Sequence, residues 1–441
     1  MLAGRAIASS NQWSGGDKTM SAWSVGAVLG AWQIGGISIV GAAQNGYTIG
    51  IAGAWYSIAG AMYFIVIALL AKPIRELMPG DSVPNYLTKR YSSKSGRLYS
   101  YIWLGLGLLY IPIQLKTIAS LIQMVLPQFN ANMAMVIGLV IAALYTGYAG
   151  MKGSAIIGKI VCIGTYALLI WFVVTKLPKF GGYSGLVSQL PENFGSMGNM
   201  PTQRIIAWII GGILSTIVMQ SVLQPVLAAK DVTSARVGSL IGYVIAGPIC
   251  IITAMIGMMG RATTAELGNG ATAFAWTLKH YSSPLIAGIV FAVSTMIIAA
   301  TLATMMMAQG TVIKNIYSTQ IRPGADDKSV LRVSRYGTFI FAFITLIPAF
   351  LIPSAQLTNM FLTLLYVATG PVSFSIFAGL LWKRTPPAAS FWSMLLGVIT
   401  GILWVVTGMV QKLDTIYPII AVSYTTGIIL TLASKKPAAA E

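Results

Sequence analysis

The sequence predicts an all-α polytopic membrane protein with about twelve transmembrane helices. Hydrophobic residues make up 56% of the 441 residues and charged residues only 9%, too few to cover the surface of a soluble protein. Apolar runs of about 20 residues, the length that a helix needs to cross a bilayer, recur along the chain. These runs lack the alternation of polar and apolar residues that is typical of a barrel strand.

The predicted helices form one membrane domain over residues 1–441, with no separate soluble domain. They span residues 23–45, 50–71, 99–126, 132–150, 155–175, 205–228, 237–260, 283–310, 333–352, 357–382, 390–410 and 415–434. Residues 1–22 contain no apolar core, so no cleavable signal peptide is predicted.

The distribution of basic residues predicts the orientation. If the N-terminus is cytoplasmic, 21 of the 28 Lys and Arg residues lie on the inner side and 6 on the outer side, and the last one is Lys116. This is the positive-inside bias of a plasma (inner) membrane protein, and it predicts that both termini are cytoplasmic. The net charge of +18 is therefore explained by topology and contact with the lipid bilayer, and no nucleic-acid partner is expected.

The residues that carry enzyme chemistry are scattered or absent from the membrane. All ten acidic residues lie in loops or termini, and Cys162, Cys250 and His280 are far apart in the sequence. No spacing typical of a metal site, a disulfide framework or a catalytic triad is present. We therefore expect no enzyme activity, no cofactor and no metal beyond sodium, which stays open.

The first predicted helix, 23–45, is interrupted near its middle by Gly30, Gly35 and Gly36 around the polar Gln33. Paired glycines weaken a helix, by about 1 kcal/mol each relative to alanine. Unwound backbone at membrane depth is tolerated where it lines a cavity, so this break predicts a binding site. The alternative is that the glycines only permit close helix packing.

Two later helices contain Gly-Pro pairs. Gly370–Pro371 in 357–382 predicts a second break, because proline removes a backbone donor. Gly247–Pro248 in 237–260 predicts a simple kink.

Lys116 is the one charge in the middle of an apolar segment. Such a charge costs at least a few kcal/mol and usually marks a pathway or a bound ion. Four interpretations remain open. Its ammonium group could replace a bound cation or carry a proton, it could bind an anionic group of the substrate, it could snorkel or pair with backbone carbonyls, or it could face a water-filled cavity.

Other polar side chains in the apolar segments outline a pathway or connect helices. Tyr110, Gln114 and Thr117 share one face of helix 99–126, and Lys116 lies off that face. Helix 205–228 carries Ser215, Thr216, Gln220, Ser221 and Gln224, and Tyr366 is a candidate gate. The predicted substrate-binding residues are Gln33, Gly35, Gln114, Lys116, Thr117, Ser215, Gln220 and Tyr366.

Several motifs occur in the order and spacing of one family. They are LAGR at the start of the chain, GAWQIGGISIVGAAQNGYTIGIAG in the broken helix, LYTGYAGMKGS (144–154), LAAKDVTSAR (227–236), IKNIY (313–317), VLRVSRYG (330–337) and GLLWKR (379–384). With them the chain resembles the solute:sodium symporter family. That resemblance implies a leucine-transporter-like core of five plus five helices in inverted repeat.

The resemblance divides the chain into a cytoplasmic segment 1–22, a ten-helix core 23–382, two additional helices within 383–434 and a cytoplasmic tail 435–441. Members of the family usually carry one more helix ahead of the LAGR segment. We therefore expect that this helix was lost or that the start given for the chain is internal.

The family's principal sodium site places backbone carbonyls of helix 1 opposite two adjacent hydroxyls on helix 8. By resemblance the carbonyls here belong to Ala31 and Ile34, and the hydroxyl pair falls on Ala299 and Ala300, or on Ala300 and Thr301. At least one hydroxyl is lost in either register. A family aspartate aligns with Gly158, and Lys116 or, less directly, Lys159 could substitute for the ion.

The resemblance implies a secondary transporter that moves a small organic solute by alternating access, with a degraded sodium site. Transport without sodium, or linked to a lysine or to protons, is therefore expected. The alternatives are a sodium-coupled symporter that retains a partial site and a non-transporting sensor on the same fold. A carboxylate is one option for the solute, and the oligomeric state is left open.

Overall fold

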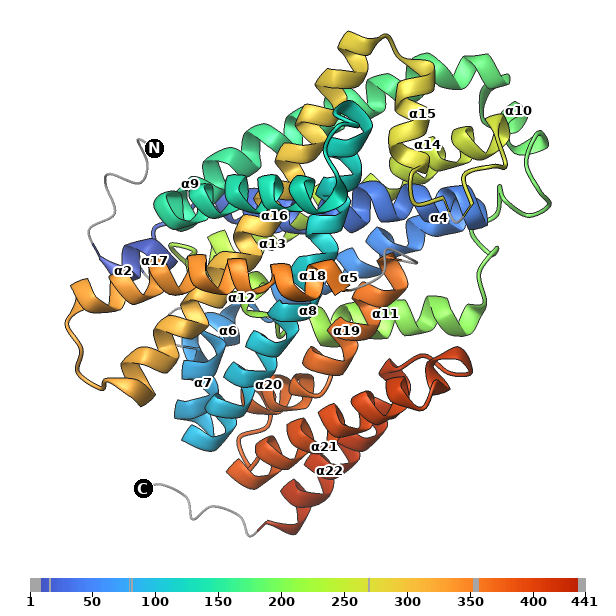
Figure 1. The fold of residues 1–441 in the computed structure, drawn as a ribbon. Coiled ribbons are helices and arrows are strands. Elements are labelled where there is room, and N and C mark those ends of the chain that lie inside the picture. The colour runs from blue at the N-terminus through green and yellow to red at the C-terminus, as the bar shows by residue number, and fades with distance from the viewer. Residues whose placement is uncertain are drawn as a thin grey trace.

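The computed structural model describes residues 9–434 except 16, 79, 81, 269 and 352–356, and only the backbone of 144, 145, 147–150, 152 and 357. The described chain is almost entirely helical (Figure 1). Within these residues the pairing of extended segments is limited to one parallel bridge between Met20 and Ala229. The all-α prediction is confirmed.

The first half of the chain supplies these helices: α2 (Ser10–Ser14), α3 (Ala22–Gln33), the π-helical turn η1 (Ile37–Gly41), α4 (Ala42–Ile49), η2 (Gly50–Ala54), α5 (Trp55–Leu69), α6 (Ala71–Leu77), α7 (Val83–Arg90), α8 (Ser93–Val125), α9 (Ala131–Lys176), η3 (Leu177–Phe180) and α10 (Gly182–Ser188).

The second half supplies α11 (Thr202–Thr216), α12 (Gln220–Leu227), α13 (Val232–Ala246), α14 (Ile249–Thr263), α15 (Ala273–Tyr281), α16 (Pro284–Ile316), the π-helical turn η4 (Tyr317–Ile321), α17 (Asp327–Ile344), α18 (Leu346–Leu351), α19 (Leu357–Thr369), α20 (Val372–Leu381), α21 (Pro387–Val406), η5 (Met409–Gln411) and α22 (Ile416–Ala433).

Three helices are interrupted inside the apolar region. The first helix stops at Gln33 and resumes as η1, as the paired glycines predict. The pair α19 and α20 bends by 52° at Gly370–Pro371, which confirms the second predicted break. The pair α11 and α12 bends by 54°. This third break was not predicted, because its connecting residues 217–219 contain neither glycine nor proline.

The Gly247–Pro248 pair behaves differently. Helices α13 and α14 meet there and still form a single membrane-length unit, Val232–Thr263, of 32 residues. The helix assignment is interrupted at Gly247–Pro248, and the predicted kink stays a prediction.

The predicted number of membrane-spanning helices is not confirmed. Among the described residues, 8 helices are long and apolar enough to span, or up to 10 if each bent pair is one span, so the count of twelve is not confirmed. One cause is α9, a helix of 46 residues that is continuous across the predicted gap between 150 and 155. Its apolar parts, Ala131–Ala143 and Gly153–Phe180, are nevertheless separate. Figure 1 shows its teal and green portions as two arms that meet at an angle.

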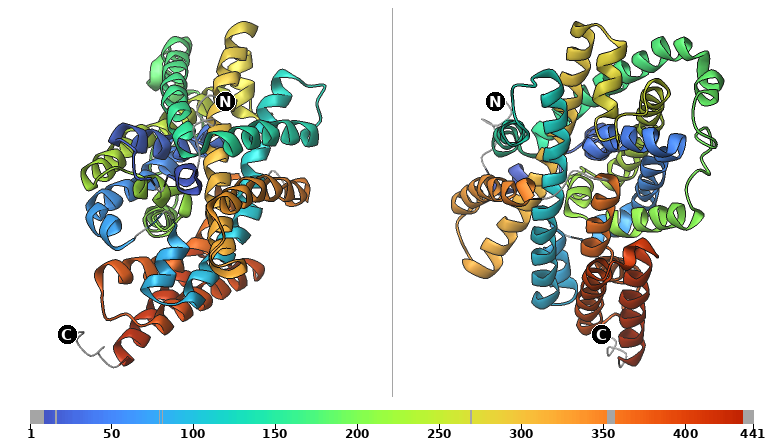
Figure 2. Two further views of the ribbon diagram at one scale, coloured as in Figure 1. Left: turned by 90° about the vertical axis from the view of Figure 1, so that its left-hand side faces the viewer. Right: turned by 45° about the vertical axis from the view of Figure 1, so that its right-hand side comes forward.

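Close packing of small residues brings the first helix to the centre of the molecule. Helix α3 packs along α13, where a Cβ on Gly26 would lie 2.9 Å from the carbonyl oxygen of Gly238. Helix α16 packs against both α8 and α9. The α21–α22 pair lies at one end of the molecule in both further views (Figure 2). The broken helix α3–η1 is therefore surrounded by α8, α13 and α16.

Candidate functional site

The break in the first helix is filled by a side chain from α8. Oε1 of Gln114 accepts a hydrogen bond of 2.8 Å from the backbone N–H of Gly36, which has no helical partner at this point. A Cβ on Gly36 would collide with Thr117, and a Cβ on Gly35 would lie 2.9 Å from the Thr301 methyl group. Both glycines are therefore required for α8 and α16 to approach the break.

A small central cavity lies beside this break. Its volume is about 20 Å³, which is enough for about one water molecule. The lining residues come from α3, α5, α11 and α19: Trp32, Gln33, Tyr56, Gly60, Trp208, Gly212, Thr216, Phe361, Leu362 and Leu365. The cavity is therefore too small for an organic solute unless these helices separate.

The walls of the central cavity combine aromatic rings with a few polar groups. Tyr56 and Trp208 meet edge to face, with ring centroids 6.4 Å apart. Gln33 is buried, and its Oε1 accepts a long hydrogen bond of 3.5 Å from Tyr63. Nε1 of Trp32 is buried, and no described residue lies within hydrogen-bond distance of it. Buried polar groups are normally paired, so these groups are suited to bind polar atoms of a ligand.

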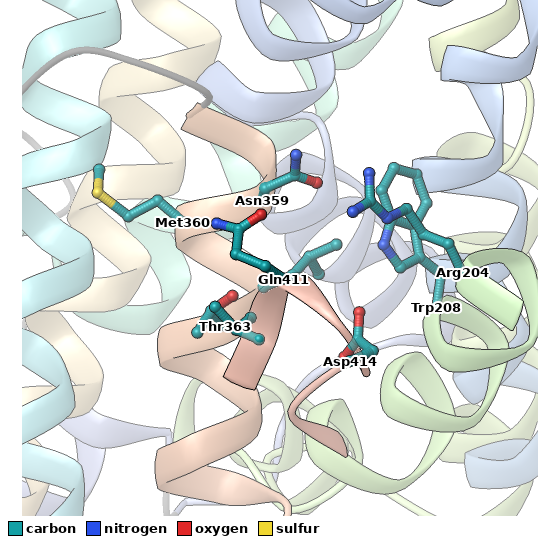
Figure 3. A pocket seen from close by; sticks show the side chains of 9 residues that line it. Arg204, Trp208, Asn359, Met360, Thr363, Gln411 and Asp414 are labelled. Carbon is teal, nitrogen blue, oxygen red and sulfur yellow. The ribbon is translucent and has the colours of Figure 1, made fainter. Parts of the chain in front are cut away.

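A second and larger hollow adjoins the central cavity (Figure 3). We call it the vestibule, and it has a volume of about 270 Å³. Its lining residues are Arg204, Trp208, Asn359, Met360, Leu362, Thr363, Val410, Gln411 and Asp414. Trp208 and Leu362 line both spaces, so they form the partition between the vestibule and the central cavity.

The opposite end of the pathway is sealed by the N-terminal helix α2. Trp13 is fully buried, and the backbone N–H of Ser10 donates to the Asp327 carboxylate at 3.1 Å. Nζ of Lys314 donates to Oγ of Ser14 at 2.9 Å, and Nε2 of Gln224 donates to the Ser14 carbonyl at 2.9 Å. These contacts join α2 to α12, α16 and α17.

The predicted cation position contains a direct hydrogen bond between its two walls. Oγ1 of Thr301 on α16 donates to the carbonyl oxygen of Ala31 on α3 at 2.7 Å, and also to Ile297 at 3.1 Å. Ala299 and Ala300 are buried and offer no side-chain oxygen. Among these three side chains, the Thr301 hydroxyl is therefore the one that offers an oxygen to a hard cation.

Gly158, which aligns with the family aspartate, packs against the same place. A Cβ there would lie 3.0 Å from the carbonyl oxygen of Ala27 and 3.4 Å from Cβ of Ala31. A carboxylate at this position would point toward the Ala31 wall, and glycine supplies none.

The predicted substrate-binding residues fall into three groups. Gln33 lines the central cavity, whereas Gly35, Gln114 and Thr117 build the break beside it. Ser215 on α11 and Tyr366 on α19 are buried, and their hydroxyls have no hydrogen-bond partner in the described part of the chain.

Gln220 lies away from the cavity. Its Oε1 accepts a 2.8 Å hydrogen bond from the N–H of Val83, and its Nε2 donates to Gln224 at 3.3 Å. Gln220 and Gln224 therefore connect helices on the sealed side, while Thr216 on the other side of the same break lines the cavity.

Lys116 and Lys159 are not among the residues that line the central cavity or the vestibule, and both side chains are half-buried. Ile34 is buried, and its N–H donates to Gly30 at 2.9 Å. The roles predicted for Lys116 and Lys159 as substitutes for sodium stay predictions.

Several lining residues were not predicted, among them Trp32, Tyr56, Trp208 and the charged pair Arg204 and Asp414. Trp32 could have been found, because it is adjacent to Gln33 at the break. Arg204 and Asp414 are separated by 210 positions of ordinary loop and helix-end sequence, so nothing local connects them.

Comparisons with known proteins agree with this architecture. A model described as the sodium:solute symporter family matches residues 14–397. The chain is 26% identical over 432 residues to the sodium/glucose cotransporter of Vibrio parahaemolyticus, covering 87% of this chain and 77% of that protein. It is 23% identical over 446 residues to sodium/myo-inositol cotransporter 2 of Mus musculus, covering 88% of this chain and 64% of that protein.

Among solved structures, the substrate-bound outward-open state of a Na⁺-coupled sialic acid symporter superimposes with a TM-score of 0.79. Sequence identity is 16%, and the match covers 99% of this chain and 95% of that chain. This likeness shows the fold.

Proposed function

Because the chain belongs to the sodium:solute symporter family and is a multi-pass membrane transporter, we propose that it carries a small organic solute by alternating access without a requirement for sodium. We place it in the plasma membrane with both termini cytoplasmic. The vestibule then faces outward, and α2, which covers the opposite end of the pathway, faces the cytoplasm.

The hydrogen bond between Thr301 and Ala31 carries the sodium-independent part of the proposal. A sodium ion in this family's site would bridge α3 and α16 through oxygen ligands. Here a hydroxyl donor satisfies the Ala31 carbonyl directly, and a net stabilisation of about 1 kcal/mol is typical for such a bond. The two helices are thus held together by the protein itself.

The chemistry of the central cavity limits the solute. Aromatic walls formed by Trp32, Tyr56 and Trp208 suit the flat or apolar face of a small molecule, and Gln33 suits its hydroxyl or carboxylate groups. The relatives named above are cotransporters of glucose and myo-inositol, and the similar structure is that of a sialic acid symporter. We propose a solute of that size, with a carboxylate as one option.

One observation favours a second candidate, a sodium-coupled symporter with a partial site. Thr301 retains a hydroxyl within reach of the Ala31 carbonyl, so a rotated Thr301 side chain would offer one oxygen to an ion. The two candidates differ in their response to sodium.

Solute counterflow in proteoliposomes separates them. The panel contains D-glucose, myo-inositol, N-acetylneuraminate and small monocarboxylates, each assayed in NaCl and in KCl of equal concentration. We expect the transported solute to exchange at the same rate in both salts. A steep requirement for NaCl would establish the second candidate instead.

A variant that restores the second hydroxyl of the predicted sodium site tests sodium binding directly. Ala300→Ser places a hydroxyl next to Thr301 and restores the adjacent pair. Since a bound ion stabilises the state that binds it, the melting temperature of this variant should rise in NaCl relative to KCl. Wild type and the exposed Ala292→Ser control on the same helix should show no difference. An equal shift in wild type would show that the site already binds sodium.

A further inference from the structure

The vestibule is a chemically defined site separate from the central cavity. Two further hollows of about 240 and 250 Å³ adjoin it, and all three share Arg204 in their linings. Its own volume of about 270 Å³ lies just below the range of roughly 300–1,000 Å³ that is usual for drug-sized ligands. The space therefore suits a metabolite of amino-acid size.

Arg204 provides the positive charge in the lining of the vestibule. It is exposed on the first turn of α11, and among the described residues its guanidinium has no hydrogen bond or ion pair. A guanidinium presents five N–H donors in a planar fork that matches a carboxylate. This group is therefore available to an anionic ligand.

Asp414 provides a negative charge on the same side of the hollow (Figure 3). One carboxylate oxygen accepts a 3.2 Å hydrogen bond from the N–H of Ile416, and within the described chain the other has no partner. Burial raises the pKa of Asp414, although the Ile416 N–H and Arg204 lower it in part. A ligand cation would compensate for the cost of keeping this carboxylate charged.

The two charges line one hollow without forming an ion pair with each other in the described structure. The remaining walls are apolar at Trp208, Met360 and Val410. Figure 3 shows Met360 across the hollow from Arg204 and Trp208. The arrangement offers one anchor for an anion, one for a cation and an apolar surface for what lies between.

We propose that the vestibule binds a small zwitterion with an apolar side group, such as an aliphatic amino acid. Its carboxylate binds the Arg204 guanidinium, its ammonium group lies against the Asp414 carboxylate, and its side group contacts Trp208 and Met360. This site is distinct from the central cavity and stands whether or not sodium-independent transport is observed.

Isothermal titration calorimetry on the purified full-length protein in nanodiscs tests the site without any transport step. L-leucine is the probe, and L-leucinamide and N-acetyl-L-leucine each lack one of its charges. We expect both analogues to bind about tenfold or more weakly, since each loses a hydrogen bond to a charged group. No binding of L-leucine, or equal binding of all three compounds, would overturn the proposal.

Two variants test the assignment of each charge. Arg204→Gln should weaken L-leucine binding and remove the difference between L-leucine and L-leucinamide. Asp414→Asn should weaken it and remove the difference between L-leucine and N-acetyl-L-leucine. These opposite patterns would not follow from general misfolding, and the exposed Lys279→Gln on α15 is the matched control.

A third variant locates the ligand. Gln33→Ala alters only the central cavity, so L-leucine binding should be retained. Loss of binding in Gln33→Ala together with normal binding in Arg204→Gln would place the ligand in the central cavity and overturn the proposal.

Discussion

At the scale of single residues, the interrupted first helix is connected to α16 by a direct hydrogen bond. The Ala31 carbonyl, which the family resemblance assigns to a cation, accepts the hydroxyl of Thr301 instead. This contact favours the register in which Ala300 and Thr301 occupy the hydroxyl pair, rather than Ala299 and Ala300.

Lys116 allows a test of the remaining coupling hypothesis at the same scale. If its ammonium replaces the cation or binds the solute, Lys116→Ala should reduce solute counterflow and change its pH profile, because the only charge within the apolar part of α8 is lost. Counterflow measured between pH 5.5 and 9 checks this, with Lys94→Ala at the exposed start of α8 as control. Wild-type rates across that range would eliminate both functional interpretations of Lys116.

At the scale of the helices, polar residues on the two sides of the break between α11 and α12 make different contacts. On one side, Thr216 lines the central cavity. On the other side, Gln220 and Gln224 bind the backbone of Val83 and Ser14, and so hold α7 and α2 against the pathway. Polar residues in this helix therefore both line the pathway and bridge helices, the two alternatives that its sequence left open.

The contact between α2 and Asp327 gives a testable prediction at the scale of the helices. Asp327→Asn should weaken the docking of α2, because the carboxylate of Asp327 accepts hydrogen bonds from the N–H and hydroxyl of Ser10. A loss of about 1–2 kcal/mol corresponds to roughly tenfold faster amide exchange in Ser10–Ser14. Hydrogen–deuterium exchange with mass spectrometry measures it.

The matched control for this variant is Asp326→Asn. Asp326 accepts a hydrogen bond of 3.0 Å from the N–H of Ser329 and caps α17. Equal exchange of α2 amides in the two variants would show that Asp327 does not hold the seal.

The whole molecule has the fold of a secondary transporter. Its central cavity is separated from the vestibule by Trp208 and Leu362, and α2 covers the opposite end of the pathway. The leucine-transporter-like architecture predicted from the motif order is confirmed by a TM-score of 0.79 to a solved symporter. A vestibule of about 270 Å³ leads to a central cavity of about 20 Å³, and α2 covers the far side. Separation of α11 from α19 at Trp208 and Leu362 would join the two spaces.

Orientation is the prediction that belongs to this scale. Because 21 of 28 basic residues fall on one side, fusion of green fluorescent protein to Glu441 should fluoresce and fusion of alkaline phosphatase there should be inactive. Insertion of the phosphatase after Lys412, on the opposite side, should give activity. The reverse pattern would place the vestibule in the cytoplasm.

The sequence by itself determined the membrane class, the family resemblance and the breaks at Gly35–Gly36 and Gly370–Pro371. Hydropathy, glycine and proline act locally, so their effects can be read from neighbouring residues. Tertiary structure alone decided the break at 217–219, the hydrogen bond between Thr301 and Ala31 and the placement of Arg204 and Asp414 in one hollow. These features depend on contacts between distant segments, and no local pattern encodes which segments meet.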